Sequence, residues 1–299
     1  MTFFELDAKF QTEQAVVDYF VKVRYPNGVQ CPHCNSVKVY QKHDRPKVYQ
    51  CDSCHNTFSV FKDTIFEHSS TDLRKWMYAI HLFLNGKKGI SALQLQREIG
   101  VTYKTAWRML QQIRTAMGNT HNPEFFNTIV EIDETYVGGK PRKDNHDDDD
   151  APKPASKCGR GTKKTPVVGM VDRTNKIAYA RVALPNDQGK RLSANQLMDI
   201  LKTMSKQENN NTIISDEFHG YDKLAKNQFV HLRIDHQTAF SNGDIHTNNI
   251  ESFWATLKRG VFGIYHHISV KYLQRYVDEF CFRYNNRKKD MLRLVLTQA

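Results

Sequence analysis

The sequence lacks a long hydrophobic run. No stretch approaches the ~18 consecutive apolar residues that a membrane-spanning helix requires. Residues 1–20 also lack the basic segment and apolar core of a secretion signal. We therefore expect a soluble, cytoplasmic protein. Hydrophobic residues still make up 39% of the 299 residues and aromatic residues 11%, so a substantial buried core is expected and a chain disordered throughout is excluded.

Cysteine is rare in this sequence, and acidic residues are fewer than basic ones. There are six cysteines, and four of them fall in two CxxC pairs, which in a chain without a secretion signal favours metal binding over disulfides. The 32 acidic residues are outnumbered by 43 Lys and Arg, giving a formal net charge of +11. A balance this basic favours a polyanionic partner such as nucleic acid.

Three regions with different patterns follow one another along the chain. Residues 1–66 are predicted to form an N-terminal helix and a cysteine-rich ribbon, and residues 71–117 are helical almost throughout. Residues 123–299 have a mixed α/β pattern. The low-complexity stretch 140–165 is predicted to be a flexible loop between two strands. Its four consecutive aspartates, Asp147–Asp150, are interpreted as part of a solvated loop and not as a metal site.

The predicted elements of the mixed region alternate between strand and helix. Strands are expected at residues 127–137, 166–171, 177–184, 212–215 and 229–234. Helices are expected at residues 193–204, 247–259 and 270–286. This order predicts a sheet with flanking helices.

The two CxxC pairs predict a structural zinc site. They are separated by 16 residues and comprise Cys31, Cys34, Cys51 and Cys54. Tetrahedral Zn²⁺ takes four thiolates, and each CxxC turn presents two sulfurs on one side of a hairpin. A complete four-thiolate set leaves no open position and no direct role for His33 or His55, so the zinc is expected to support folding and not catalysis. The alternative is four structural cysteines without metal.

Residues 90–117 predict a helix-turn-helix. Leu93, Leu95 and Ile99 supply apolar positions in the first helix, Gly100 the turn, and Thr102 the cap of the second helix.

This region is also strongly basic. Between residues 74 and 117 there are eight basic residues and one acid, a composition that suits phosphate contacts. Tyr103, Lys104 and Arg108 are the candidates for contacts in a DNA groove. The alternative is an ordinary three-helix linker with a solvated basic face.

Three carboxylates are placed where they can converge. Asp133 lies in an apolar strand, where a charge is costly unless it is paired or holds a metal. Asp216 follows the end of another strand, and Glu251 lies on a later helix with Lys258 two turns beyond it. Such acids can hold a pair of Mg²⁺ or Mn²⁺ ions for phosphoryl transfer. Taken singly, each has an ordinary alternative as a strand-edge acid, a helix cap or a solvated side chain.

The motifs together resemble one family. They read EIDETYVGGK (131–140), SD (215–216) with GY (220–221), HTNNIESFW (246–254), LKRG (257–260), YHHI (265–268), LQRY (273–276) and FRYNNR (282–287). This combination, with the leading zinc ribbon and helix-turn-helix, resembles the bacterial DDE transposases of the insertion-sequence family numbered fifteen-ninety-five, the ISXO type. The resemblance covers nearly the whole chain.

The resemblance implies a ribonuclease-H-like catalytic domain, with Asp133, Asp216 and a third metal ligand on the late helix. Members of the family differ at the third position, and some carry Asn or His. We choose Glu251 because its seven-residue step to Lys258 matches the acid-to-basic spacing of DDE enzymes, with Asn249 as the second candidate. Lys258 and the neighbouring Arg259 are the DNA-contact candidates of this helix.

The sequence therefore predicts a metal-dependent transposase that cuts DNA at insertion-sequence ends and joins them to target DNA. Its expected partners are the terminal inverted repeats, target DNA and a second copy of the chain, because two ends must be held together. Its expected location is the bacterial cytoplasm at the nucleoid. Two alternatives remain: a catalytically inactive zinc-ribbon regulator that binds DNA, and a ribonuclease-H-type nuclease that prefers RNA–DNA hybrids.

Overall fold

The computed structural model describes residues 1–119, 129–138, 164–184, 192–204, 212–216, 230–234 and 246–298. The chain forms two compact units, one of Met1–Thr120 with Asn286–Ala299 and one of His121–Asn285. Among the described residues, no helix is both long and apolar enough to cross a membrane. Nearly all of the predicted loop 140–165, Cys158, and the Gly220-Tyr221 motif lie outside the described residues.

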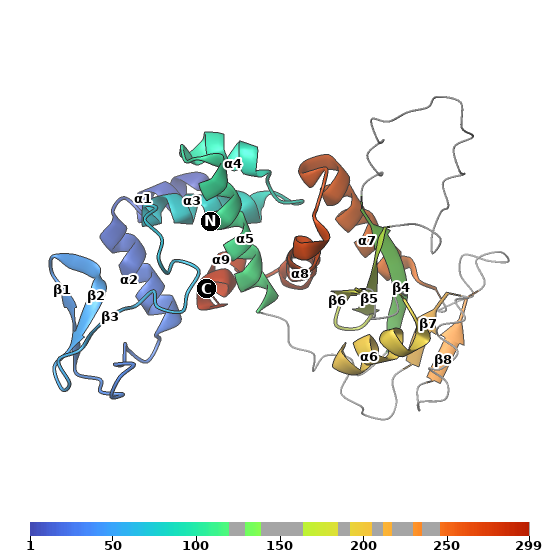
Figure 1. Ribbon diagram of the computed structural model, residues 1–299, viewed down its shortest axis with the longest axis horizontal. Coiled ribbons are helices and arrows are strands. Elements are labelled where there is room, and N and C mark those ends of the chain that lie inside the picture. Colours follow the sequence, from blue (N-terminus) through green and yellow to red (C-terminus); the bar gives the residue numbers. More distant parts are fainter. Residues whose placement is uncertain are drawn as a thin grey trace, which may run out of the picture. The chain divides into compact units, whose positions relative to one another are not determined.

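The first unit begins with two helices and a small sheet (Figure 1). The helices are α1 (Phe3–Lys9) and α2 (Glu13–Arg24). Strands β1 (Val39–Lys42), β2 (Arg45–Cys51) and β3 (Thr57–Ser59) form an antiparallel sheet in that order. Helix α1 is not among the expected elements; Thr2 and Glu5 form a reciprocal capping box at its start.

The rest of this unit is helical. It contains α3 (Leu73–Asn85), α4 (Ala92–Ile99), α5 (Tyr103–Gly118) and, from the other end of the chain, α9 (Met291–Gln298). Helix α9 contacts α2, α3 and α5 and buries Leu292, Val295 and Leu296. The sequence pattern predicts that residues 291–298 belong with the region 123–299. The structure groups them with the N-terminal unit because this short apolar stripe packs against those helices.

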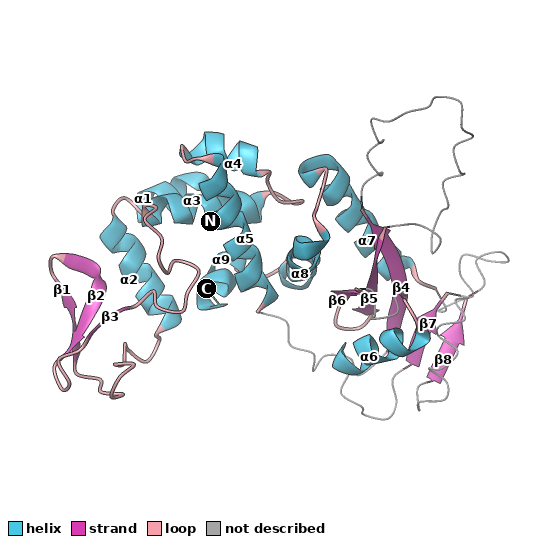
Figure 2. Cartoon of the chain, in the orientation of Figure 1, coloured by secondary structure: helices cyan, strands magenta, loops and turns pink. Residues whose placement is uncertain are grey.

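The second unit is built on a five-stranded sheet in the order β6-β5-β4-β7-β8 (Figure 2). The strands are β4 (Ile129–Val137), β5 (Thr165–Asp172), β6 (Ile177–Val182), β7 (Thr212–Ser215) and β8 (Val230–Arg233). The first three pair antiparallel, whereas β7 and β8 run parallel to β4. This order and these directions are those of a ribonuclease-H-like sheet. The predicted mixed α/β fold is confirmed.

Helices cover both faces of this sheet. On one face, α6 (Ala194–Met204) packs Leu197 and Met198 against β4, β5 and β7. On the other, α7 (Asn248–Gly260) and α8 (Val270–Asn286) form a larger core that includes the predicted core residue Cys281. A π-helical turn, η4 (Val261–Tyr265), links these two helices.

A glycine sets how closely α7 approaches the sheet. A Cβ atom on Gly169 of β5 would lie 2.5 Å from the ring of Trp254. Gly169 is also the partner of Asp133 across the β4–β5 ladder. The absence of a side chain at residue 169 therefore lets α7 pack directly beside Asp133.

Candidate functional site

Two neighbouring strands bring Asp133 and Asp216 together. Strands β4 and β7 are parallel, and Glu131 pairs with Ile214. Two residues further along both strands, the register brings Asp133 level with Asp216. Carboxylate oxygens of Asp133, Glu134 and Asp216 all lie within 4.8 Å of one another. Three hard oxygen donors this close form a group that can hold a divalent cation.

The electrostatics of Asp133 fit such a cation. Burial and the neighbouring charges of Glu134, Asp216 and Glu251 raise the pKa of Asp133 to about 8, against the pull of the Glu134 backbone N–H. That N–H donates to Asp133 Oδ1 at 2.8 Å. Because these acids repel one another, a bound cation would be stabilised by the same crowding that holds a proton on Asp133.

Glu134 is a member of this group that is not among the residues predicted from the sequence. Adjacent residues of a strand usually point to opposite faces, so the strand pattern alone gives no reason to expect Glu134 beside Asp133. The available signal was two acids in succession, Asp133 and Glu134, near the end of an apolar strand.

Glu251 lies near this group but not within it. It sits exposed on the first turn of α7, and its Oε1 accepts a hydrogen bond from Thr247 Oγ1 at 2.7 Å. Its charge contributes to the raised pKa of Asp133. Among the described residues, its oxygens are not part of the 4.8 Å group. Lys258 and Arg259 lie on the exposed face of the same helix, and Arg259 Nε donates to Ala255 O at 3.0 Å.

Asn249, the second candidate for the third ligand, faces another partner. Its Nδ2 donates to Glu131 Oε1 at 2.7 Å, and its backbone N–H donates to Glu131 Oε2 at 2.8 Å. Its Oδ1 lies 3.5 Å from Lys176 Nζ. The amide group of Asn249 is therefore engaged by Glu131 and Lys176.

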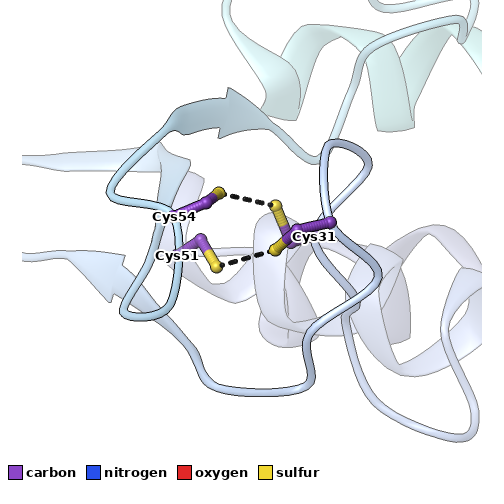
Figure 3. A group of neighbouring side chains, drawn as sticks. Cys31, Cys51 and Cys54 are labelled. Atoms are coloured by element: carbon purple, nitrogen blue, oxygen red, sulfur yellow. Dashed lines mark hydrogen bonds between the residues drawn. The ribbon is translucent and has the colours of Figure 1, made fainter.

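The four predicted zinc ligands converge in the first unit, and Figure 3 labels three of them, Cys31, Cys51 and Cys54. The Cys31 and Cys54 sulfurs lie 3.6 Å apart, and the Cys34 and Cys51 sulfurs 3.5 Å apart. A tetrahedron with Zn–S bonds of ~2.3 Å requires S–S separations of roughly 3.8 Å, so the arrangement fits the metal. Burial raises the pKa of the Cys51 thiol, but backbone N–H groups of Cys54 and Ser53 and the neighbouring thiols lower it to about 6. Against the pull of a backbone N–H, hydrogen bonds to the other three sulfurs raise the pKa of Cys34 to about 12, so without metal the cluster shares its protons unequally.

Donors around the cluster also favour thiolates. The His33 backbone N–H approaches Cys31 Sγ at 3.4 Å, and Asn56 Nδ2 approaches Cys54 Sγ at 3.5 Å. Hydrogen bonds of this kind stabilise the negative sulfur that zinc requires.

The helix-turn-helix elements lie where the sequence predicts them. Gly100 ends α4 in the left-handed conformation, with φ of 61°, and Thr102 Oγ1 caps α5 by accepting from Thr105 N at 3.2 Å. Of the apolar positions expected in the first helix, Leu95 is buried, whereas Leu93 is 57% exposed. Tyr103 is 48% exposed at the start of α5.

The basic surface of this region is smaller than its composition indicates. Lys104 is exposed, but Arg108 is half-buried and its Nη2 lies 3.4 Å from Glu67 O. Arg114 is 1% exposed, with its guanidinium over the Phe83 ring. Lys75 Nζ donates to Gly100 O at 2.9 Å. Several of the basic side chains therefore hold the helices together.

Two known protein families match this chain, each over a different range of residues. The fold and its acidic group define a ribonuclease-H-like domain, and residues 126–285 match the family described as the ISXO2-like transposase domain. Residues 11–57 match the transposase zinc-ribbon domain. The chain belongs to the ISXO2-like family of insertion-sequence transposases.

Two related proteins match different lengths of this chain. The chain is 30% identical over 300 residues to the "Uncharacterized protein in transposable element ISH50" of Halobacterium salinarum, covering 97% of this chain and 98% of the relative. It is 32% identical over 74 residues to an "Uncharacterized transposase-like protein" of Haemophilus influenzae, covering 25% of this chain and 59% of that protein. The solved Mos1 Strand Transfer Complex aligns with a TM-score of 0.32 at 15% identity, over 70% of this chain and 73% of that one.

Proposed function

We propose that this chain is a divalent-metal-dependent DDE transposase, which cuts DNA at insertion-sequence ends and transfers the freed strand into target DNA. The observation that carries the proposal is the group of carboxylates from β4 and β7 at one place on a ribonuclease-H-like sheet, in a chain that belongs to a transposase family. We infer that it works in the cytoplasm, on DNA ends held by at least two copies of the chain.

The acidic residues have the chemistry to hold Mg²⁺ or Mn²⁺. Asp133 and Asp216 would be ligands from the sheet, with Glu134 close enough to be a further ligand, and Glu251 would be the third ligand, from α7. We favour Glu251 over Asn249 because the Asn249 amide is already bonded to Glu131. Cations held there would supply Lewis-acid stabilisation of the charge that develops at a phosphate during in-line displacement.

Other residues would bind and orient the DNA. Lys258 and Arg259, exposed beyond Glu251 on α7, would hold phosphates near the scissile bond. Tyr103 and Lys104 at the start of α5 would contact the inverted repeat, with Arg108 in a supporting role. The zinc held by Cys31, Cys34, Cys51 and Cys54 would stabilise the ribbon.

The test is cleavage of duplex DNA that carries the insertion-sequence ends, in Mn²⁺ and in EDTA. Wild-type protein should cut at the ends in Mn²⁺ only, and Asp216→Asn should not cut. Asp199→Asn, which changes an exposed acid on α6, should cut like wild type. Retained cleavage by Asp216→Asn would contradict the proposal, and a preference for RNA–DNA hybrids would favour a ribonuclease-H-type nuclease.

A further inference from the structure

Strand β4 carries one more carboxylate, Glu131, which is buried and has no part in the proposed chemistry. Glu131 has no exposed surface and lies two residues before Asp133, on the same face of the strand. A buried charge is costly unless hydrogen bonds and opposite charges compensate it. The partners of Glu131 therefore indicate what it stabilises.

Those partners are the first turn of α7 and one arginine. Glu131 Oε2 accepts from the backbone N–H groups of Asn249 and Ile250 at 2.8 and 2.9 Å. Thr247, at the N-cap position, makes no side-chain capping bond to the helix backbone. Glu131, which lies on β4, therefore caps the N-terminus of α7 and places its negative charge at the positive end of the helix.

Arg173 extends this contact to the segment before the helix. It lies in the turn between β5 and β6, and its Nε donates to Glu131 Oε1 at 2.6 Å. Its Nη2 donates to the carbonyl oxygen of His246. His246 Nδ1 lies 3.4 Å from the same Glu131 oxygen. Residues 246–250 are thus attached to β4 and to the β5–β6 turn by one connected set of polar contacts.

We propose that Glu131 is a positioning residue, which fixes the first turn of α7 on β4 so that Glu251 faces Asp133 and Asp216. This inference rests on the proposed function, since it assigns Glu251 to the metal site. Glu251 directly follows Ile250, whose N–H is held by Glu131. The Glu251 side chain is exposed, and its Oε1 accepts a hydrogen bond from Thr247 Oγ1, which belongs to the same anchored segment. The same strand thus carries a metal ligand and, two residues earlier, the anchor of the helix that supplies another.

The experiment compares two buried glutamates in the full-length, zinc-loaded chain. Glu131→Gln keeps the shape of the side chain but removes its charge. Glu279→Gln is the matched control, because Glu279 is equally buried and is bonded to Arg283 and Tyr265, away from the acidic group. Mn²⁺ affinity is measured from the electron paramagnetic resonance signal of free Mn²⁺, and the thermal midpoint is measured alongside.

Both variants should unfold at a lower temperature than wild type, but only Glu131→Gln should bind Mn²⁺ ~10–100-fold more weakly, the usual effect of losing a residue that orients a ligand. Glu131→Asp, which keeps the charge, should recover part of the affinity. Unchanged affinity in Glu131→Gln, or an equal loss in both variants, would overturn the proposal.

Hydrogen exchange separates this inference from the proposed function. In Glu131→Gln, amides of residues 249–253 should exchange faster than in wild type, while those of α8 should not. If wild type bound no Mn²⁺, the proposed metal chemistry would fail, and the exchange result alone would decide whether Glu131 holds α7. Unchanged exchange at the start of α7 would overturn the positioning role in either case.

Discussion

Asp133 has a strongly raised pKa, because burial and the neighbouring acids both disfavour its ionised form. Its raised pKa has one origin in burial and a second in the charges of Glu134, Asp216 and Glu251. Without a cation, the folded protein relieves this repulsion by keeping a proton on Asp133 at pH values where an ordinary aspartate has lost it. The site therefore has a measurable cost in stability that a neutral side chain would remove.

Thermal unfolding in EDTA should reveal this cost as a pH dependence. The folded-state pKa of Asp133 is about 8, against a usual value of 3.8. Between these values the folded state holds a proton that the unfolded state has released, so stability falls as the pH rises through this window, by up to ~1.4 kcal/mol per pH unit. Asp133→Asn has no such proton, so it should unfold near the wild-type temperature at pH 4 and well above it at pH 8.

Asp199→Asn is the control for this measurement, because it removes an exposed acid from α6. Its difference from wild type should not change between pH 4 and pH 8. A constant difference for Asp133→Asn as well would contradict the assignment of a raised pKa to this residue.

At the scale of elements, long segments with a clear hydrophobic period were predicted close to their bounds, whereas the short helices α1 and α9 were not predicted. Strand β4 and helices α5, α7 and α8 lie within two residues of their expected bounds. Helix α1 has only seven residues, and its Phe3 and Phe4 are exposed. It therefore has no continuous apolar face from which the helix could be predicted. Helix α9 depends on partners elsewhere in the chain. The capping role of Glu131 also depends on a contact across 118 residues, which local pattern cannot show.

The zinc ribbon should depend on its four sulfurs and not on the neighbouring histidine. Cys34→Ala should lose the bound zinc and the exchange protection of β1–β3, because three thiolates leave the tetrahedral site incomplete. His33→Ala should keep one zinc per chain, since only its backbone N–H approaches the cluster. Zinc released on thiol modification, measured with a metal-binding dye, distinguishes the two. Loss of zinc from His33→Ala would show that the four-cysteine assignment is wrong.

The spacing between α7 and the sheet gives a second prediction at this scale. Gly169→Ala would bring a methyl group within 2.5 Å of Trp254 and push α7 away from β5. We expect a loss of ~1–3 kcal/mol in the free energy of unfolding from overpacking. End cleavage should fall by roughly 100-fold, because Glu251 moves with the helix.

Gly263→Ala provides the comparison, because nothing lies within 4 Å of the position where its Cβ would be. It should retain wild-type stability and cleavage. If Gly169→Ala lost stability but cleaved at the wild-type rate, the position of α7 would not matter for the chemistry.

At the scale of the whole molecule, the net charge of +11 predicts DNA binding that weakens with salt. The number of phosphate contacts cannot be taken from composition, because Arg114 and Lys75 are engaged within the first unit. Lys104 is the exposed candidate at the start of α5. The composition therefore predicts an anionic partner, whereas side-chain packing decides which cations are free to contact it.

Lys104→Ala should bind insertion-sequence ends more weakly and reduce the slope of log affinity against log salt by about one. Lys288→Ala removes one charge from an exposed residue outside the helix-turn-helix and should leave the slope unchanged. Fluorescence anisotropy across a salt series measures both. Equal slopes for Lys104→Ala and wild type would exclude Lys104 from the phosphate contacts.

Strand transfer tests the central claim most directly. A pre-cleaved insertion-sequence end with a free 3′-hydroxyl is incubated with supercoiled target DNA and Mg²⁺ or Mn²⁺. Wild type and Asn249→Ala should produce joined products, although Asn249→Ala more slowly, and Asp133→Asn, Asp216→Asn and Glu251→Gln should produce none. Joining by Glu251→Gln but not by Asn249→Ala would move the third ligand to Asn249. A wild-type protein that binds the ends but joins none of them with either metal would contradict the account and favour a DNA-binding regulator.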